Sequence, residues 1–345
     1  MQTLRTLEAL EREGLIASAA DLAEAAESMA IALTPDMLAL IDRADPADPI
    51  ARQFVPSAAE TRVAAEELAD PIGDAARSPV KGIVHRYPDR VLLKPVHVCP
   101  VYCRFCFRRE KVGPGGEALS ADELDRAVAY IAADTRIWEV ILTGGDPLML
   151  APRRLSELIG RLDTLAHVGV IRVHSRVPIV DSGRVTEALV AALKPRRAAL
   201  WLAVHSNHPR ELGPATRAAL ARLADAGIPL LGQTVLLAGV NDDADTLDAL
   251  MRALVTARVK PYYLHHPDLV RGTGHFRVSI ERGQALMKAL RGRLSGLAQP
   301  TYVLDVPGGH GKVPVGPSYL SGYRGDDPGA LLVEDAFGRR HSYPR

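Results

Sequence analysis

Six short apolar runs recur along the middle of the chain, and each is followed by a stretch whose apolar residues have helical spacing. The runs predict strands at 91–96, 138–142, 170–173, 200–204, 229–236 and 259–264. The predicted helices cover 120–133, 153–164, 183–193, 211–226, 244–256 and 279–292. Ser120, with Glu123 three residues later, has the pattern of a capping box. Six tandem βα units indicate a parallel sheet, and their regularity favours a barrel or partial barrel over an open sheet.

The chain has a different pattern on either side of these units. From Leu15 to Leu33 the apolar residues alternate steps of four and three, which predicts a small helical region over about the first 45 residues. A short helix is expected near 59–68 and a further strand at 301–306, whereas the tail from about 324 is expected to be partly ordered at best. The expected organisation is an N-terminal helical region (1–75), a barrel (76–295) and a C-terminal segment (296–345).

Composition and charge exclude several classes of protein. Of the 345 residues, 47% are apolar and 24% are charged, as in ordinary globular proteins, and the net charge is +1. This balance argues against a general nucleic-acid or anionic membrane surface. We find no apolar run of about 18 residues, and acidic residues interrupt the first segment, so we expect a cytoplasmic protein.

Polar residues gather at or near the C-terminal ends of all six predicted strands. They are the cysteine loop, then Thr143-Gly144-Gly145-Asp146-Pro147, His174-Ser175-Arg176, His205-Ser206-Asn207-His208, Gln233, and finally His265, His266 and Asp268. In βα barrels these ends converge on the functional face. The pattern therefore predicts an active site at one mouth of a barrel.

All three cysteines of the chain are closely spaced, as Cys99-x3-Cys103-x2-Cys106. Three thiolates on one short loop can turn toward one point, as in iron–sulfur proteins. A structural zinc needs a fourth ligand, for which His97 is the nearby candidate. We predict a [4Fe-4S] cluster with one iron that the protein does not ligate, and keep a zinc-dependent hydrolase as the distant alternative.

Lys312 follows the glycine-rich turn Pro307-Gly308-Gly309-His310-Gly311. Val313 and Pro314 come next, where a phosphate-binding P-loop would have Ser or Thr and a helix. One interpretation is a surface lysine. The other is a lysine near the barrel mouth that binds pyridoxal 5′-phosphate (PLP) as a Schiff base.

The cysteine loop resembles the signature of the radical S-adenosylmethionine (SAM) superfamily, and residues from about 40 to 320 resemble the lysine 2,3-aminomutase family. The resemblance is carried by HRYPDRVLL, the cysteine loop continuing to Arg108, LTGGDPL, RVHSRVPIV, HSNHP, QTVLLAGVND, PYYLHHPDL with GTGHFR, and DVPGGHGK. It implies an α/β fold, a partial (β/α)6 TIM-like barrel with a C-terminal PLP-lysine segment. It also implies an isomerase that interconverts L-lysine and β-lysine with a [4Fe-4S] cluster, SAM and PLP.

The same resemblance implies roles for single residues. The cluster would be held by Cys99, Cys103 and Cys106, and the SAM site would be lined by Gly144, Gly145, Asp146, His205 and Gln233. Lys312 would carry PLP, and Arg86 and Arg90 would bind the PLP phosphate. Arg108 would bind the carboxylate of the substrate, and Asp268 and Asp305 would bind the distal ammonium of the substrate. Two acids suit a diamino acid, because burying a cation requires opposing charge. A glutamate-specific enzyme would need the opposite sign there.

The chain also departs from the family. His310 stands where better-known members have a further glycine, and we expect it either to alter the freedom of the hinge or to place a proton donor near PLP. A short relative makes β-lysine for elongation factor P, although it is less faithful at DVPGGHGK, and a role in that pathway is the alternative. The other expected partners are an amino acid substrate, an electron donor such as flavodoxin or ferredoxin, and a second copy of the chain in a homo-oligomer.

Overall fold

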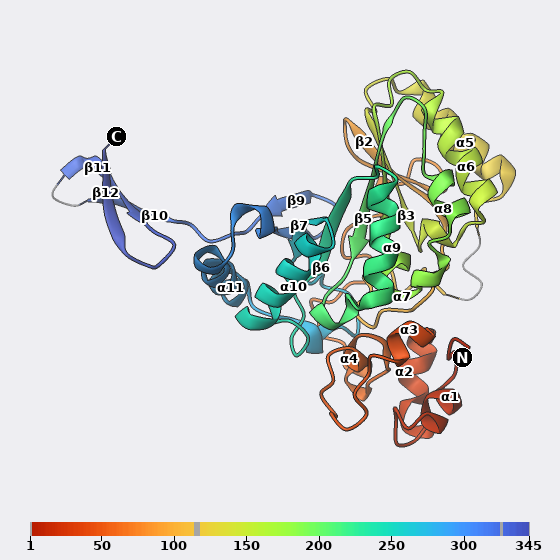
Figure 1. Ribbon diagram of the computed structural model, residues 1–345, viewed down its shortest axis with the longest axis horizontal. Coiled ribbons are helices and arrows are strands. Elements are labelled where there is room, and N and C mark those ends of the chain that lie inside the picture. The colour runs from red at the N-terminus through yellow and green to blue at the C-terminus, as the bar shows by residue number, and fades with distance from the viewer. Residues whose placement is uncertain (1, 114–117, 325–326, 345) are drawn as a thin grey trace.

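The computed structural model describes residues 2–113, 118–324 and 327–344, and its main feature is a nine-stranded sheet (Figure 1). The strands lie side by side in chain order: β1 (Ile83–Tyr87), β2 (Arg90–Val96), β3 (Glu139–Gly144), β4 (Val170–Ser175), β5 (Ala199–His205), β6 (Leu230–Val235), β7 (Val259–His265), β8 (Thr301–Val306) and β9 (Gly311–Pro314). Strands β2 to β8 are parallel, whereas β1 and β9 are antiparallel to their neighbours. The six predicted βα units and the strand at 301–306 are confirmed; β1 and β9 were not predicted.

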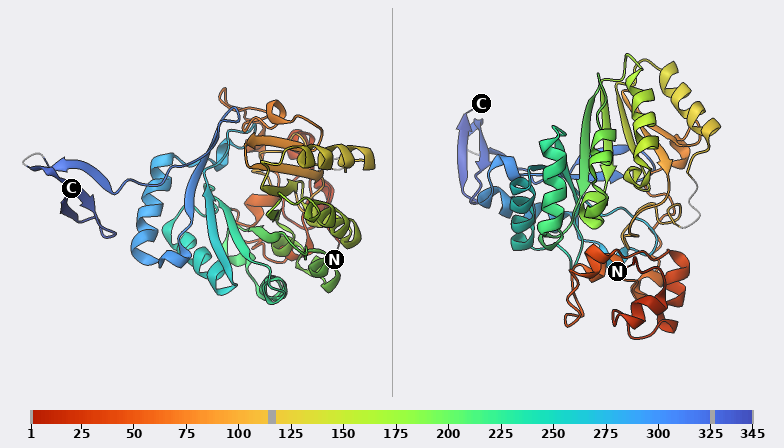
Figure 2. Two further views of the ribbon diagram at one scale, coloured as in Figure 1. Left: turned by 90° about the horizontal axis from the view of Figure 1, so that it is seen from above. Right: turned by 45° about the vertical axis from the view of Figure 1, so that its right-hand side comes forward.

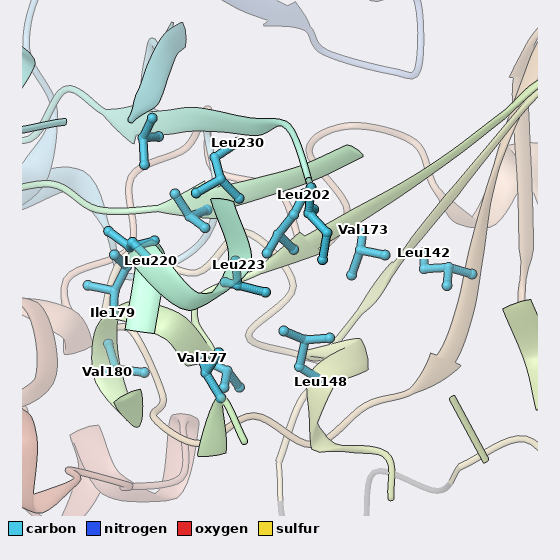
Figure 3. Close-up of a cluster of buried hydrophobic side chains, with 14 of the residues drawn as sticks. Leu142, Leu148, Val173, Val177, Ile179, Val180, Leu202, Leu220, Leu223 and Leu230 are labelled. Atoms are coloured by element: carbon cyan, nitrogen blue, oxygen red, sulfur yellow. The ribbon is translucent and has the colours of Figure 1, made fainter. Parts of the chain in front are cut away.

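Helices cover the outside of this curved sheet (Figure 2). They are α5 (Ala121–Ala133), α6 (Pro152–Asp163), α7 (Val177–Val180), α8 (Glu187–Ala192), α9 (Pro214–Asp225), α10 (Ala244–Thr256) and α11 (Ile280–Arg293). Helix α5 begins at the predicted capping box, where the Ser120 hydroxyl accepts from the Glu123 amide and the Glu123 carboxylate accepts from the Ser120 amide. In the core, Leu142, Val173 and Leu202 from neighbouring strands are fully buried beside Leu220 and Leu223 of α9 (Figure 3).

The N-terminal region is less helical than its spacing predicts. It contains α1 (Leu7–Arg12), a 3-10 turn (Ala20–Leu22), α2 (Ala23–Ser28), α3 (Pro35–Leu38) and α4 (Ala51–Phe54). The predicted small helical region is present, but it consists of short helices, because the backbone is extended at Met29 and Leu33 pairs with Leu4 in a β-bridge. The helix expected near 59–68 is only a 3-10 turn, Ala58–Thr61.

The C-terminal tail is also different from the expectation. Strands β10 (Leu320–Arg324), β11 (Asp327–Glu334) and β12 (Arg340–Pro344) form a separate antiparallel sheet beside α11, where Glu334 pairs with Lys288 at 2.7 Å (Figure 1). The turn between β11 and β12 is held by the Asp335 carboxylate, which accepts from the amides of Phe337 and Arg339. Asp335 and Gly338 (φ +81°) are residues typical of such turns, so a composition that suggests disorder also suits this hairpin.

Two further expectations concern the boundaries between the three regions and the lack of a membrane-spanning segment. The boundaries at 75/76 and 295/296 stay predictions, although β8 and β9 continue the barrel sheet beyond the second of them. Among the described residues, no helix has the length and apolar character needed to cross a membrane.

Candidate active site

A cavity of about 630 Å³ lies inside the barrel, and every residue to which the family resemblance assigned a cluster, SAM, PLP or substrate role lines it. Those residues are Arg86, Arg90, Cys99, Cys103, Cys106, Arg108, Gly144, Gly145, Asp146, His205, Gln233, Asp268, Asp305 and Lys312. The cavity continues to Asp89, Trp138 and Glu139 at the N-terminal ends of β2 and β3. It is therefore longer than an active site confined to one mouth. The individual roles of these residues stay predictions.

Some polar residues at the strand ends lie outside the cavity. His266 bonds to the Tyr302 hydroxyl over 2.7 Å, and neither it nor His208 is part of the lining. His97, the candidate fourth zinc ligand, is not part of the lining either. Proximity to a strand end thus selected the right region but did not identify which side chains face inward.

The cysteine loop is anchored by arginines that point away from the cavity. The Arg104 side chain is fully buried and donates to both carboxylate oxygens of Glu60, at 2.6 to 3.1 Å, and to the carbonyl oxygens of Met29 and Ala30. Arg109 donates to the same Glu60 carboxylate at 2.7 Å. This buried triad attaches the cysteine loop to the N-terminal region, and it leaves the thiols free to face the cavity.

The three thiols line the same cavity and are the donors that an iron–sulfur cluster needs, although among the described residues no three such side chains are grouped so as to hold a single metal ion. Burial raises the pKa of each, that of Cys106 to about 11, and the neighbouring thiols add to the rise for Cys99 and Cys106. Three thiolates would therefore need a compensating positive charge, which iron supplies. The Arg176 guanidinium donates to the sulfur of Cys103 over 2.7 Å, and such hydrogen bonds are common around protein-bound clusters.

The glycine-rich segment at the end of β3 packs against the entry to the cysteine loop. A Cβ atom on Gly144 or Gly145 would overlap the carbonyl oxygen of Val96 or Val98, respectively, and Gly144 also has a φ of +118°. The amide of Gly145 donates to the Val96 carbonyl at 2.8 Å. Only glycine permits this approach, so the two glycines place the cysteine loop against the sheet.

Asp146 has a structural task that its motif did not reveal. Its buried carboxylate accepts hydrogen bonds from the Ser175 hydroxyl at 2.7 Å and from the amides of Leu148, Arg176 and Val177. These bonds hold together the loops that follow β3 and β4. The Asp146 carboxylate oxygens are therefore already engaged within the protein.

A cluster of cations around Asp74 forms one side of the cavity. Arg108 donates to Asp74 at 3.0 Å and Arg86 donates to it at 3.1 Å, while the Lys94 ammonium lies 3.6 Å away. Burial opposes ionisation, but these three cations keep the pKa of the Asp74 carboxyl below its usual value. Three cations around one carboxylate leave an excess of positive charge. In addition, the Arg86 Nε atom is buried and has no hydrogen-bond partner among the described residues, so this side suits anions such as a phosphate and a carboxylate.

Lys312 lies on β9, directly opposite Asp305 on β8, and its ammonium pairs with the Asp305 carboxylate. The same nitrogen lies 3.4 Å from Nδ1 of His265 and 5.8 Å from the centre of the Tyr263 ring. A lysine amine inside a cavity that also contains Arg86 and Arg90 fits the requirements of PLP, an aldehyde with a phosphate.

His310 does not have the chemical role that was one expectation for it. The side chain is exposed and does not line the cavity, so it places no proton donor there. Gly308, Gly309 and Gly311 have φ values of +83°, +82° and +96°, whereas His310 is outside the left-handed region. A side chain is therefore tolerated at this one position of the turn.

Burial and neighbouring charges set the ionisation of the remaining groups. Burial, and to a lesser extent the neighbouring Asp305 carboxylate, raises the pKa of Asp268 to about 7. Burial lowers the pKa of His174, His205 and His265, that of His205 to about 3, so these imidazoles are neutral at pH 7. The histidines followed predicted strands and were visible in the sequence.

Four lining or supporting residues were missed by sequence reasoning: Asp74, Tyr87, Arg172 and Tyr263. Arg172 and Tyr263 lie inside predicted strands, where alternation could have marked them as facing the barrel interior. Asp74 and Tyr87 had no comparable signal, because their importance depends on contacts with distant parts of the chain.

Comparison with known proteins places the chain in a family. The profile of the Radical SAM superfamily matches residues 93–250, and that of Lysine-2,3-aminomutase matches residues 287–327. L-lysine 2,3-aminomutase of Clostridium subterminale is 42% identical over 87% of this chain and 72% of that protein. The enzyme of the same name from Acetoanaerobium sticklandii is 44% identical over 85% of this chain and 71% of its own.

A third relative is named for glutamate instead of lysine as its substrate. Glutamate 2,3-aminomutase of Clostridioides difficile is 36% identical over 84% of this chain and 68% of that protein. Together these similarities favour a radical SAM enzyme over a zinc-dependent hydrolase. The barrel and the extent of the sequence similarity show that the chain belongs to the lysine 2,3-aminomutase family of radical SAM isomerases.

Proposed function

We propose that this isomerase interconverts L-lysine and β-lysine. The observation that carries the proposal is the position of the Lys312 ammonium, which pairs with Asp305 while Asp268 lines the same cavity. This ion pair indicates that the acidic part of the cavity can hold an ammonium group close to the PLP anchor. The distal ammonium of L-lysine carries the same charge, whereas the distal carboxylate of glutamate would be repelled.

The radical SAM domain implies a [4Fe-4S] cluster and SAM, and the family uses PLP. When bound, the cluster and SAM supply a radical that removes hydrogen from the β-carbon, and PLP supplies the π-system through which the amino group migrates. We propose that Cys99, Cys103 and Cys106 hold the cluster, and that Gly144, Gly145, Asp146, His205 and Gln233 form the SAM site. The protein contributes position and the exclusion of water.

Arginines would orient the two anionic groups. We assign the PLP phosphate to Arg86 and Arg90 and the substrate carboxylate to Arg108, because guanidinium groups bind such anions in a fixed geometry. Arg108 is held in place by Asp74 and by the Thr143 hydroxyl, 3.3 Å away. Because these two contacts already fix the Arg108 side chain, it needs little reorganisation when the substrate binds.

Apolar side chains beside the cysteines would shield the radical from water. Phe105, which lies between Cys103 and Cys106, packs edge-on against His205 and Phe276, with ring centres 5.7 and 6.0 Å apart. Phe276 is buried and packs with Leu237 and Val240. Phe105, Leu237 and Phe276 of this group line the cavity.

The decisive experiment is anaerobic reconstitution with iron, sulfide, PLP, SAM and a reductant, followed by chromatography after incubation with L-lysine or L-glutamate. We expect β-lysine from lysine and no β-glutamate from glutamate. A Lys312→Ala variant should lose the absorbance band of lysine-bound PLP and retain its iron. Formation of β-glutamate alone, or a PLP band in Lys312→Ala, would contradict the proposal.

The partners are proposed on chemical grounds. Reduction of the cluster needs a one-electron donor, for which a flavodoxin or a ferredoxin is suitable. A homo-oligomer and a supply of β-lysine to elongation factor P stay predictions from the resemblance. Turnover of free lysine without that factor would separate the aminomutase from an accessory enzyme that works only in its presence.

A further inference from the structure

The barrel sheet ends in two hairpins whose outer strands meet without pairing. Strands β1 and β9 are the two edges of the nine-stranded sheet, yet the amide of Lys312 on β9 donates to the Tyr87 hydroxyl on β1 over 2.6 Å. Seen from above, the strands surround a central space (Figure 2). We call the contact among Tyr87, Gly311 and Lys312 the seam. It joins residues 225 positions apart in the chain.

The backbone at the seam is shaped for this contact. A Cβ atom on Gly311 would lie 2.8 Å from the Tyr87 hydroxyl, so a side chain there would push the hydroxyl away. The preceding turn is held from its other side, where the amide of Gly308 donates to the Pro71 carbonyl at 3.1 Å. A Cβ atom on Gly73 would lie 2.8 Å from Gly308. The turn before Lys312 thus fits between the segment at 71–73 and Tyr87.

Tyr87 also contacts the proposed phosphate-binding side of the cavity. The guanidinium of Arg90, which opposes Tyr87 in the β1–β2 hairpin, lies 3.7 Å from the centre of its ring. Arg86, the preceding residue, lies 3.8 Å from Asp305, the carboxylate that pairs with Lys312. The lysine anchor and the phosphate-binding arginines therefore belong to opposite edges of the sheet, and Tyr87 touches both sides.

We propose that Tyr87 is a positioning residue that keeps the PLP anchor at the correct distance from the phosphate-binding arginines by closing the seam. PLP, attached to Lys312 and bound by Arg86 and Arg90, would then bridge the same two edges. The inference rests on the roles proposed for these three residues. Because one hydrogen bond contributes about 0.5–1.5 kcal/mol, its loss should raise the dissociation constant of PLP about 2- to 12-fold.

The test is a PLP titration of the full-length, cluster-loaded protein under anaerobic conditions, followed by the absorbance of lysine-bound PLP. Tyr87→Phe removes the hydroxyl but keeps the ring beneath Arg90, and we expect weaker PLP binding with unchanged iron content. Tyr130→Phe is the matched control. Its hydroxyl bonds to His85 on the same strand over 2.7 Å but does not line the cavity, so PLP affinity should not change.

Hydrogen exchange gives a second readout that does not depend on activity. In the wild type, PLP should slow amide exchange in peptides covering β1 and β8–β9. In the absence of PLP, exchange in the β8–β9 peptide should be faster in Tyr87→Phe than in the wild type. Wild-type PLP affinity in Tyr87→Phe, or exchange that PLP leaves unchanged in these strands, would overturn the inference. If Lys312→Ala keeps the absorbance band of lysine-bound PLP, the assignment of Lys312 as the PLP anchor is wrong, and the proposed function is then wrong as well.

Gly311→Ala tests the same contact from the other strand and keeps the Tyr87 hydroxyl. It should also weaken PLP binding, because the added methyl group meets that hydroxyl and the φ of +96° disfavours alanine. The loss of affinity should be smaller in a Tyr87→Phe background, where the hydroxyl is already absent. Equal losses in both backgrounds would show that Gly311 acts without Tyr87 and would argue against the seam.

Discussion

The Michaelis constant for L-lysine should fall about tenfold between pH 6 and pH 8, because Asp268 has a pKa of about 7. Burial raises this pKa first and Asp305 raises it further, while Lys312, Arg108 and Arg86 oppose the rise. The carboxylate would be about one-eleventh ionised at pH 6 and about ten-elevenths ionised at pH 8. Only the ionised form attracts the distal ammonium of the substrate, so the tenfold change in its population should appear in KM.

The assay is the initial rate of β-lysine formation by the loaded enzyme at half-unit steps of pH. Asp268→Asn should raise KM at pH 8 about 10- to 100-fold, as expected when a hydrogen bond to a charged group is lost, and should flatten the profile between pH 6 and pH 8. Asp181→Asn is the control, because burial also raises the pKa of Asp181, which lies outside the cavity. A flat wild-type profile, or an unchanged KM in Asp268→Asn, would refute the assignment.

Asp268 should affect stability in the opposite direction. An acid whose pKa is raised in the folded state favours folding when it is protonated. Its contribution is complete below the unfolded pKa of about 3.9 and is lost as the pH rises through about 7. The same ionisation that improves substrate binding therefore weakens the substrate-free fold.

Two further predictions concern the cysteine loop. Glu60→Gln leaves the buried Arg104 and Arg109 without a counter-charge and should lower the free energy of unfolding by about 3–5 kcal/mol, measured by urea denaturation of the cluster-free protein. Gly145→Ala should displace the loop, because the new methyl group would overlap the Val98 carbonyl, and should reduce the iron bound per chain after reconstitution.

Matched variants distinguish these effects from general damage. Glu66→Gln removes an exposed carboxylate and should change the unfolding free energy by less than about 1 kcal/mol. Gly160→Ala places a methyl group in open space on α6 and should leave iron binding unchanged. If Glu60→Gln unfolds like Glu66→Gln, or if Gly145→Ala binds iron like the wild type, the anchoring described for the loop is incorrect.

The strands β2 to β8 could be predicted because buried parallel strands are short continuous apolar runs. Strand β1 contains His85 and Arg86, and β9 is four residues long and includes Lys312, so neither has that pattern. The helical spacing between Leu15 and Leu33 indicated a helical region but not where its helices end, since spacing alone does not reveal that the backbone becomes extended at Met29.

The sequence predicted those site residues that belong to recognisable motifs. The cysteines, Lys312 and the polar residues after the strands are recognisable locally, and the structure brings them to one cavity. Asp74 and Tyr87 are different. Asp74 matters because it contacts Arg108, 34 residues away, and Tyr87 because it contacts Lys312, 225 residues away. No local pattern predicts contacts of that kind in a single sequence.

The Glu60 triad has a consequence for how the protein can be divided. Secondary structure changes near residue 75, but Arg104 and Arg109 on the barrel side depend on a carboxylate and on carbonyl groups from the N-terminal side. A barrel expressed without residues 1–75 would keep all three cysteines and still lack the partners of two buried guanidinium groups. Cluster binding by the cysteine loop therefore depends on the N-terminal region. We expect the loop to lose its iron when it is transferred to another protein or when residues 1–75 are removed.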